Sequence, residues 1–266
     1  MMDADVDMRR SKLSRMILGN TKELTFDQLQ DLAYDTRLYW PLTEIPKLAD
    51  DYERLKQQQD LAKSVAVYWQ HLNSWDFRST VESTQTTLAL AWYEELYGLG
   101  YPAETLKTEY QDRLTWFRAL KKAADKVKGL YGDWKHPWGQ AHRLQRIANQ
   151  PDVLSAGVRL NPIMKSLPCA GTPGPLGIVF TVYSSPEIRI IRPQRFAVVG
   201  ASYTSVVEFK ERIEAASIVP FGASGRRSSP HFFDQAELFC QQKFKPAPFY
   251  RNEVAESATE SISLER

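Results

Sequence analysis

The segment FGASGRRSSPHFFDQAELF, residues 221–239, holds the densest group of side chains that could do chemistry. It places a Gly-x-x-Gly turn, two arginines, three serines and His231 within nineteen residues. Backbone amides in such a turn can cradle an anion, and Arg226 and Arg227 would add positive charge. A connection whose glycines need a positive φ is the simpler interpretation of the same residues.

Nucleophilic catalysis by a serine has little support in the sequence. A Ser-His-Asp set can be assembled on paper from almost any chain, and no G-x-S-x-G turn favours one here. The carboxylate pairs Glu94-Glu95 and Asp50-Asp51 fall on helix faces or ends that we expect to be solvated. We therefore interpret them as surface groups rather than as an acid–base pair.

The histidines and cysteines have no recognisable metal-binding spacing. His136 and His142 lie six residues apart with Pro137 between them, whereas a helical zinc pair has i,i+4 spacing. Cys169 and Cys240 are the only cysteines, so there is neither a C-x-x-C pair nor a disulfide framework. We expect solvent-facing or hydrogen-bonded structural histidines, unpaired structural thiols and no cofactor in this chain.

Residues 131–146, YGDWKHPWGQAHRLQR, place two tryptophans and a proline before a short amphipathic segment. Aromatic rings mixed with arginines can stack on nucleic acid. However, 34 Lys and Arg against 32 Asp and Glu leave a formal charge of +2, without the concentrated basic surface that nucleic-acid binding requires. We therefore expect tryptophans that anchor a loop on the core and arginines that pair with acidic neighbours.

Length and composition indicate a globular protein of one or two domains. The 266 residues are 43% hydrophobic, enough to bury a core. No stretch approaches the ~20 apolar residues that span a bilayer, so we expect no membrane partner. The charged N-terminus lacks the apolar region of a secretory signal, which taken alone favours the cytoplasm, but localisation stays unknown because Met1 need not be the natural start.

The first half of the chain has helical periodicity. Apolar residues recur at i+3 and i+4 within residues 51–73, and Ser83 or Thr84 could cap a second long helix. A third helix is expected at about residues 103–128, and a shorter one after Thr25. Residues 1–130 should therefore be mainly helical.

The second half has strand composition instead. Strands are expected at residues 177–185, at 196–209 with an interruption at Gly200, and at 213–221, the last two as an antiparallel pair. A short helix near residues 234–242 and a frayed polar tail from residue 255 should close the chain. Helices followed by strands indicate an α+β protein or part of a larger layered domain.

Separated segments, taken in order, resemble one family: the penicillin acylase (penicillin amidase) family of N-terminal-nucleophile hydrolases, which includes acyl-homoserine-lactone and aculeacin acylases. The similar segments are residues 24–37, 72–84, 131–146, 166–180, 202–209 and 221–249. The family's W-G-x-x-x-RLQR and G-x-S-G-x-x-x-SPHY-x-DQ motifs resemble stretches of this chain through Trp138, Gly139, Arg143, Arg146, Ser229, His231, Asp234 and Gln235.

The resemblance implies an amidohydrolase with a four-layer αββα fold, of which residues 1–266 would form the C-terminal part of the β chain. Family members cleave their own precursor and free a Ser, Thr or Cys, whose α-amine acts as the base in hydrolysis of an acyl amide. An asparagine and a backbone amide stabilise the oxyanion. Substrates implied are β-lactam side chains, acyl-homoserine lactones or lipopeptides.

The family's nucleophile has no counterpart in these residues. The Gly171-Thr172 pair lies within SLPCAGTPG and is followed by Pro173, outside the family's processing context. We therefore expect a truncated chain, inactive alone, whose partners are the missing N-terminal part and the α chain. Typical members are periplasmic or secreted, and the calcium site that some hold is not identifiable here. A non-catalytic binding or scaffold module derived from the family is the alternative.

One active-site group carries over by position from the family. Its site-organising arginine precedes the LTFDQ-like helix by about fifteen residues and falls on Arg10, with Arg9 as the alternative register. The motif residues near 138–146 and 229–235 are expected to be structural, with Asp234 as the N-cap of the closing helix. Strands that lack partners should leave exposed edges and apolar patches.

Overall fold

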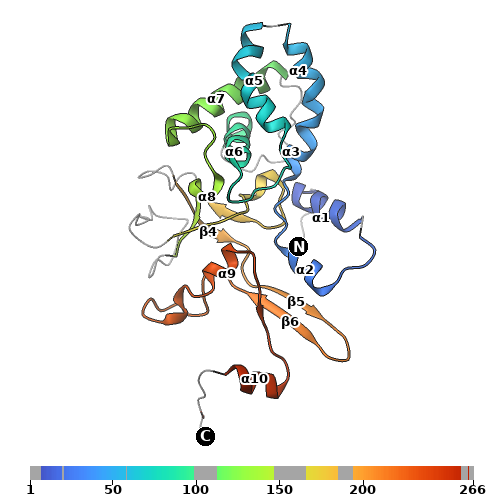
Figure 1. Ribbon diagram of the computed structural model, residues 1–266, viewed down its shortest axis with the longest axis vertical. Helices are drawn as coiled ribbons and strands as arrows, with labels where there is room; N and C mark the ends of the chain where they lie inside the picture. The colour runs from blue at the N-terminus through green and yellow to red at the C-terminus, as the bar shows by residue number, and fades with distance from the viewer. Residues whose placement is uncertain are drawn as a thin grey trace.

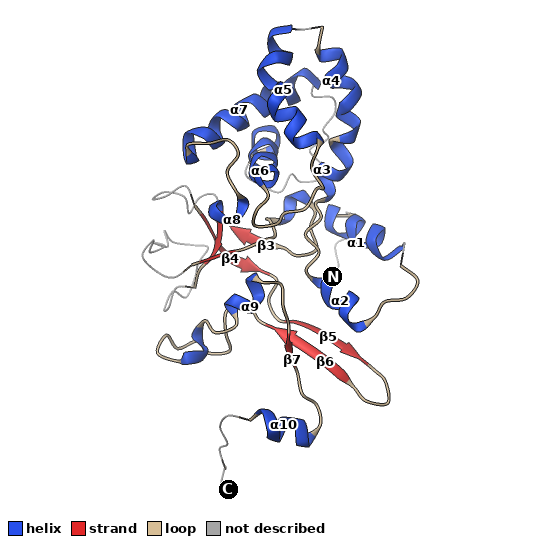
Figure 2. Cartoon of the chain, in the orientation of Figure 1, coloured by secondary structure: helices blue, strands red, loops and turns tan. Residues whose placement is uncertain are grey.

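The computed structural model describes residues 7–19, 21–57, 59–98, 113–146, 166–184, 194–258 and 263. Helices occupy the first half and short strands the second, which confirms the α+β class (Figures 1 and 2). In the described residues up to 131, the helices are α1 (Arg9–Gly19), α2 (Phe26–Ala33), α3 (Tyr39–Glu44), η1 (Pro46–Leu48), α4 (Ala49–Leu55), α5 (Gln59–Asn73), α6 (Thr84–Tyr97) and α7 (Arg113–Tyr131).

The helix starts follow the expected capping chemistry. Thr25 and Gln28 form a reciprocal capping box at the start of α2, and the Ser83 hydroxyl accepts the amide hydrogen of Thr86 in α6. In its described part, the third long helix begins at Arg113, so the expectation for residues 103–112 lies outside the described residues.

Aromatic rings fill the core between these helices, where α6 and α5 pack against α7 (Figure 1). The Trp40 ring stacks on Trp116 with centroids 6.0 Å apart and meets Trp92 edge-on at 5.3 Å. Tyr52 stacks on Trp69 at 5.3 Å. Such offset and edge-to-face pairs add to the free energy gained by burying large rings.

Two small sheets follow. The first has the order β2 (Leu167–Pro168), β1 (His142–Leu144), β4 (Arg195–Gly200) and β3 (Val182–Ser184), with β1 and β4 parallel. The second is β5 (Thr204–Glu208), β6 (Glu214–Ile218) and β7 (Lys245–Pro246), in which β5 and β6 form the expected antiparallel pair. The remaining helical elements are α8 (Trp138–Ala141), η2 (Gly174–Leu176), η4 (Pro230–Phe232), α9 (Ala236–Cys240) and α10 (Arg251–Ser257).

The strand expected at residues 177–185 is wrong over most of its length. Only Val182–Ser184 forms a strand, and residue 185 lies outside the described residues. Upstream, the Phe180 amide donates to the carbonyl of Asp35, and Thr181 makes only an isolated bridge with Thr172. The backbone is therefore bonded to other segments before a strand can begin.

Gly200 interrupts the strand composition of residues 196–209, as expected, but it separates strands of different sheets. A Cβ at Gly200 would lie 2.5 Å from the carbonyl oxygen of Thr181. The chain therefore needs glycine where β4 ends against the first sheet, and β5 begins four residues later in the second.

The C-terminal tail is helical to Ser257, where the sequence suggested fraying from residue 255. Arg212 in the β5–β6 turn forms an ion pair with Glu253 of α10, and its guanidinium lies 5.6 Å from the Tyr250 ring centroid. The hairpin and α10 project together from the molecule (Figure 1). At the hairpin end the Phe209 ring is 84% exposed. The expected apolar patches stay a prediction.

Candidate functional site

Arg9 and Arg10, the two registers for the site-organising arginine, have different surroundings at the start of α1. Arg9 Nη1 donates to the Tyr93 hydroxyl and to the Pro175 carbonyl, both at 2.8 Å. Gly177 has a φ of +72°, and a Cβ there would lie 2.5 Å from Arg9 Cβ. Arg10 is exposed. The Arg9 side chain is thus held in one position, while Arg10 faces solvent.

Trp138 and Gly139 join the helices to the first sheet. The buried Trp138 indole N–H donates to the Gly171 carbonyl at 2.7 Å, and the Trp138 amide donates to the Ser83 carbonyl at 3.0 Å. A Cβ on Gly139 would lie 2.7 Å from the Cβ of Val81. The expected anchoring of this loop by a tryptophan is therefore confirmed for Trp138.

His142 lies fully buried behind Trp138. The two rings stack with centroids 4.6 Å apart. His142 Nδ1 is 2.8 Å from the Cys169 carbonyl oxygen, which can only accept, so Nδ1 carries the hydrogen. Burial, assisted by the charge of Arg195, lowers the pKa of His142 to about 4. The ring is neutral near pH 7, as a hydrogen-bonded structural histidine should be.

Arg143 and Arg146 bind carbonyl and hydroxyl oxygens of distant segments. Arg143 Nε donates to the Ser166 hydroxyl at 2.8 Å, and its Nη2 to the Ser166 carbonyl at 2.7 Å. Arg146 Nη1 donates to the carbonyls of Ser224, at 2.8 Å, and Phe232, at 2.5 Å. In the described part of the chain these partners replace the acidic neighbours that the sequence suggested.

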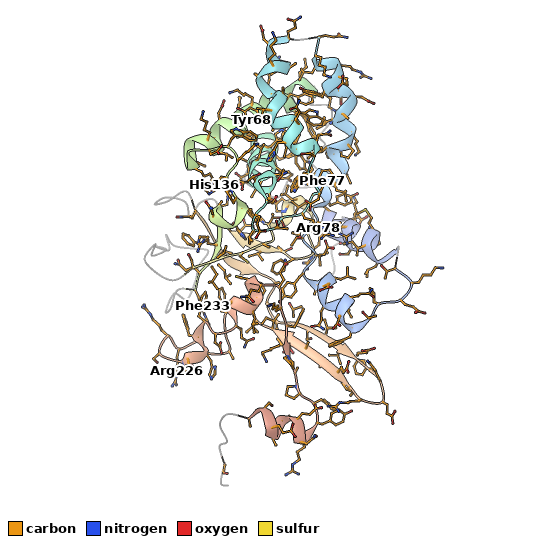
Figure 3. All side chains as sticks on the ribbon, in the orientation of Figure 1. Tyr68, Phe77, Arg78, His136, Arg226 and Phe233 are labelled. Carbon is orange, nitrogen blue, oxygen red and sulfur yellow. The ribbon has the colours of Figure 1, made fainter. Side chains whose placement is uncertain are left out.

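The turn at residues 222–231 uses its amides internally. The Ser224 amide donates to the His231 carbonyl, and the Arg226 amide to the Ser224 hydroxyl. Neither glycine of the turn has a positive φ, so the interpretation that this connection needs glycines with a positive φ is wrong. Gly222 is instead required for close packing, because a Cβ there would lie 2.2 Å from the His231 carbonyl oxygen. Arg226 points away from the body of the molecule (Figure 3). The turn and this arginine therefore do not form an anion cradle.

The SPHFFDQ residues also bind one another and the nearby chain. The Ser229 hydroxyl accepts the His231 amide hydrogen, and His231 Nδ1 lies 2.8 Å from Asp234 Oδ2. Gln235, not Asp234, occupies the N-cap position of α9, which corrects the expectation for that helix. The Gln235 side-chain oxygen accepts from the Val219 amide at 3.3 Å. These four motif residues thus shape the segment after β6.

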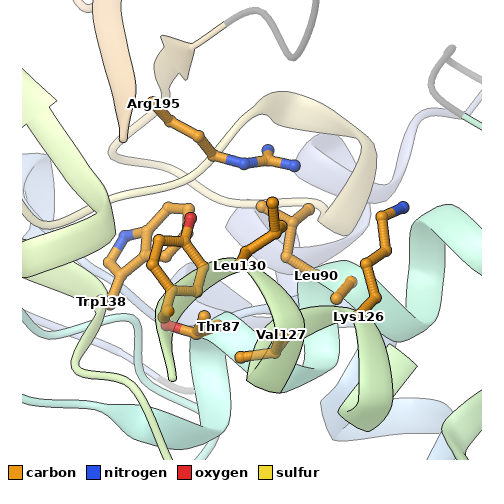
Figure 4. Close-up of a pocket in the computed structure, with 9 residues that line it drawn as sticks. Thr87, Leu90, Lys126, Val127, Leu130, Trp138 and Arg195 are labelled. Carbon is orange, nitrogen blue, oxygen red and sulfur yellow. The ribbon is translucent and has the colours of Figure 1, made fainter. Parts of the chain in front are cut away.

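The buried ion pair between Glu94 and Arg195 is a contact that sequence reasoning missed. Their side chains are 6% and 4% exposed, so the assignment of Glu94 to the solvated surface is wrong. Figure 4 shows Arg195 above a small pocket lined by Thr87, Leu90 and Trp138 among others. From Leu88 to Tyr93, α6 is apolar on all sides, which is typical of a helix buried in the centre of a molecule. A carboxylate on such a helix needs a partner, so the sequence already indicated that Glu94 would be paired.

The described motif side chains hold segments together and do not set a nucleophile beside a base. In the described ranges no three His, Cys, Asp or Glu side chains gather in a way that could hold a metal ion. No helix among the described residues has the length and apolar character to span a bilayer.

Comparison with known proteins gives a consistent result. The family model described as penicillin amidase matches residues 3–256. A thermostable penicillin G acylase from Alcaligenes faecalis, in orthorhombic form, has a similar fold, with a TM-score of 0.52 and 14% sequence identity. The match covers 100% of this chain and 54% of that chain, so the present chain spans about half its length. Curated proteins give no match. Because the family model covers nearly the whole chain, the protein belongs to the penicillin amidase family.

Proposed function

We propose that this chain forms the C-terminal part of a penicillin amidase-type hydrolase that cleaves a linear acyl amide. The observation that carries the proposal is the family match over residues 3–256. The structurally similar protein is named a penicillin G acylase, which supports an acyl amide such as a β-lactam side chain as the substrate class. Acyl-homoserine lactones and lipopeptides are the further candidates within the family.

We further propose that the catalytic nucleophile is supplied by residues outside these 266, either on the same polypeptide or on another chain. The motif side chains described here are engaged with backbone carbonyls and with one another. The similar acylase is nearly twice as long as the matched region. An N-terminal nucleophile whose own α-amine removes its proton would complete the site, with this chain as its support.

Mixing this chain with the complementary part of a penicillin amidase tests the proposal directly. The complement would be the region of the Alcaligenes faecalis acylase to which this chain has no counterpart, and the assay would follow release of a chromophoric amine from an acyl anilide. Turnover is expected from the mixture and not from either part alone. Replacing the complement's N-terminal nucleophile by alanine should abolish it. Turnover by the 266 residues alone would overturn the proposal.

Failure of the mixture to turn over would be interpreted through binding. If the two parts associate and retain an acyl amide without cleaving it, the non-catalytic module becomes the better description. Size-exclusion chromatography and calorimetry with the uncleaved anilide distinguish these outcomes.

Arg9 is our choice for the site-organising arginine, because its side chain is fixed by Tyr93 and Pro175. In an active mixture, Arg9→Ala should lower kcat/KM by about tenfold or more, since small misplacements of catalytic groups have effects of that order. The matched control is Arg10→Ala on the exposed side of the same helix turn. A larger loss of kcat/KM with Arg10→Ala would instead identify Arg10 as the site-organising arginine.

A further inference from the structure

The only two cysteines of the chain lie in the same hydrophobic cluster, although they are far apart in the sequence. Cys169 follows β2 directly and has no solvent exposure. Cys240 ends α9 and is half-buried against that cluster. Because α9 packs on β2, the two thiols meet where the closing segment lies against the first sheet.

The two thiols are neighbours within this cluster. The proximity of Cys240, together with burial, raises the pKa of the Cys169 thiol. Tyr34 lies beside both: burial raises the pKa of its hydroxyl first, and the neighbouring Cys169 and Cys240 raise it further. Both thiols are free. Both cysteines of the chain thus lie in a cluster that also contains the rings of Phe180 and Phe239.

We propose that Cys169 and Cys240 form a reversible disulfide that fastens α9 and the closing segment to the first sheet under oxidising conditions. Disulfides require β-carbons that approach closely, and Cys240 at the end of α9 and Cys169 directly after β2 lie on elements that pack against each other within one hydrophobic cluster. No role in amide hydrolysis is involved. The pair is instead a modification site whose oxidant would be a small disulfide such as glutathione disulfide.

The accessibility of the two thiols sets the order of the steps. The half-buried Cys240 loses its proton to solvent and attacks one sulfur of glutathione disulfide, which releases one glutathione as a thiolate that takes up a proton. Cys169 then attacks the Cys240 sulfur. The sulfur–sulfur bond to the second glutathione breaks, and that glutathione leaves with the Cys169 proton. Two protein thiols are oxidised, and one glutathione disulfide is reduced to two thiols.

Mass spectrometry of the folded, unsubstituted protein after incubation with glutathione disulfide tests the proposal. The expected product has lost two hydrogens, carries no glutathione and has no thiol that reacts with an alkylating agent after denaturation. Dithiothreitol should restore both thiols. A product that keeps two titratable thiols, or that retains glutathione on Cys240, would overturn the proposal.

Single substitutions check the order of attack, because each leaves one cysteine. Cys169→Ser should accumulate the mixed disulfide on Cys240, whereas Cys240→Ser should remain unmodified since Cys169 is buried. Oxidation of the unsubstituted protein should raise Tm by roughly 5–10 °C, as expected for a cross-link that closes a long loop. It should also slow proteolysis between residues 221 and 240, and equal proteolysis before and after oxidation would contradict the fastening role.

Discussion

In the helical region, α3 to α7, the core consists of aromatic rings packed on one another, as between Trp40, Trp92 and Trp116. In the sheet region, α8 to β7, polar side chains make the long-range connections. Trp138 and Arg146 there bind carbonyl oxygens of distant segments. The sheet region also buries a hydrophobic cluster, in which the Phe180 and Phe239 ring centroids are 5.2 Å apart. The comparison is therefore between a region stabilised mainly by ring packing and one in which hydrogen bonds of defined geometry are added to burial.

The two kinds of core respond differently to change. Dispersion and burial act between any well-packed apolar surfaces, so helix packing can tolerate small shifts. A carbonyl bound by one arginine is left unsatisfied when that arginine is lost, and a buried unsatisfied group has a high free-energy cost. The motif residues Trp138 and Arg146 thus lie where the contacts depend on particular side chains.

Loss of a central ring should have the largest effect. Trp92→Ala removes a fully buried indole and its bond to the Trp116 carbonyl, and should lower the free energy of unfolding by about 4 kcal/mol. Urea denaturation followed by circular dichroism measures this change. Phe249→Ala, at a 62% exposed ring, is the control and should change stability by less than about 0.5 kcal/mol.

The ion pair between Glu94 and Arg195 joins the two regions, and its loss should have the next largest effect on stability. Arg195→Met removes the buried guanidinium that pairs with Glu94, while Lys126 Nζ remains 4.0 Å from Glu94 Oε2, and the substitution should cost about 3 kcal/mol. Glu94→Leu combined with Arg195→Met should recover much of that loss, because two apolar side chains then replace two buried charges. If the double variant is less stable than Arg195→Met alone, the ion pair stabilises the fold by more than the mutual neutralisation of its two charges.

Acid should weaken the sheet region through His142. The pKa of His142 is about 4 in the folded protein, below its value of 6.5 in an exposed site, so the unfolded state binds a proton first as pH falls. Stability should therefore decline between pH 6.5 and 4 by up to roughly 3 kcal/mol. Urea midpoints measured against pH for the unsubstituted protein and for His142→Asn isolate this contribution. If the urea midpoints of the two proteins depend on pH in the same way, His142 does not contribute to the loss of stability in acid.

A smaller and more local effect is expected at Arg146. Arg146→Ala removes the bonds to the Ser224 and Phe232 carbonyls and should cost about 1–2 kcal/mol. Limited proteolysis should then cut the loop near residues 224–229 faster. Arg226→Ala, in the same loop but exposed, is the matched control and should leave the cleavage rate unchanged.

The least effect on stability is expected at the hairpin end. Phe209→Ser should change the free energy of unfolding by less than about 0.5 kcal/mol, since this ring is 84% exposed. It should nevertheless reduce self-association of the chain, as measured by light scattering against protein concentration. Unchanged scattering would show that the exposed ring at the β5–β6 turn does not drive contacts between molecules.

The helical region was largely predictable from the sequence, whereas the sheet region was predictable only in outline. Val65, Trp69 and Leu72 lie on one buried face because i+3 and i+4 positions meet within a single helix. Gly200 likewise interrupts a strand composition locally. These signals are carried by neighbouring residues, which is why periodicity and capping rules detect them.

The remaining contacts depend on segments that are distant in the chain. The Phe180 amide bonds to the Asp35 carbonyl, and no property of residues 177–181 indicates that partner. Asp234 has the residue type of an N-cap, but its carboxylate is engaged with His231. Resemblance identified the motif residues Trp138 and Arg146, while their backbone acceptors could be found only in the folded chain.

The distribution of tryptophan along the chain has a consequence for spectroscopy. All seven tryptophans lie at or before Trp138, and Trp138 itself sits where the helical region meets the first sheet. Intrinsic indole fluorescence therefore reports on the helical region and its boundary, and the β5–β6–β7 sheet contributes no such emission. A denaturation curve recorded by fluorescence would follow one half of the molecule, and its divergence from an amide-based signal would measure how independently the two halves unfold.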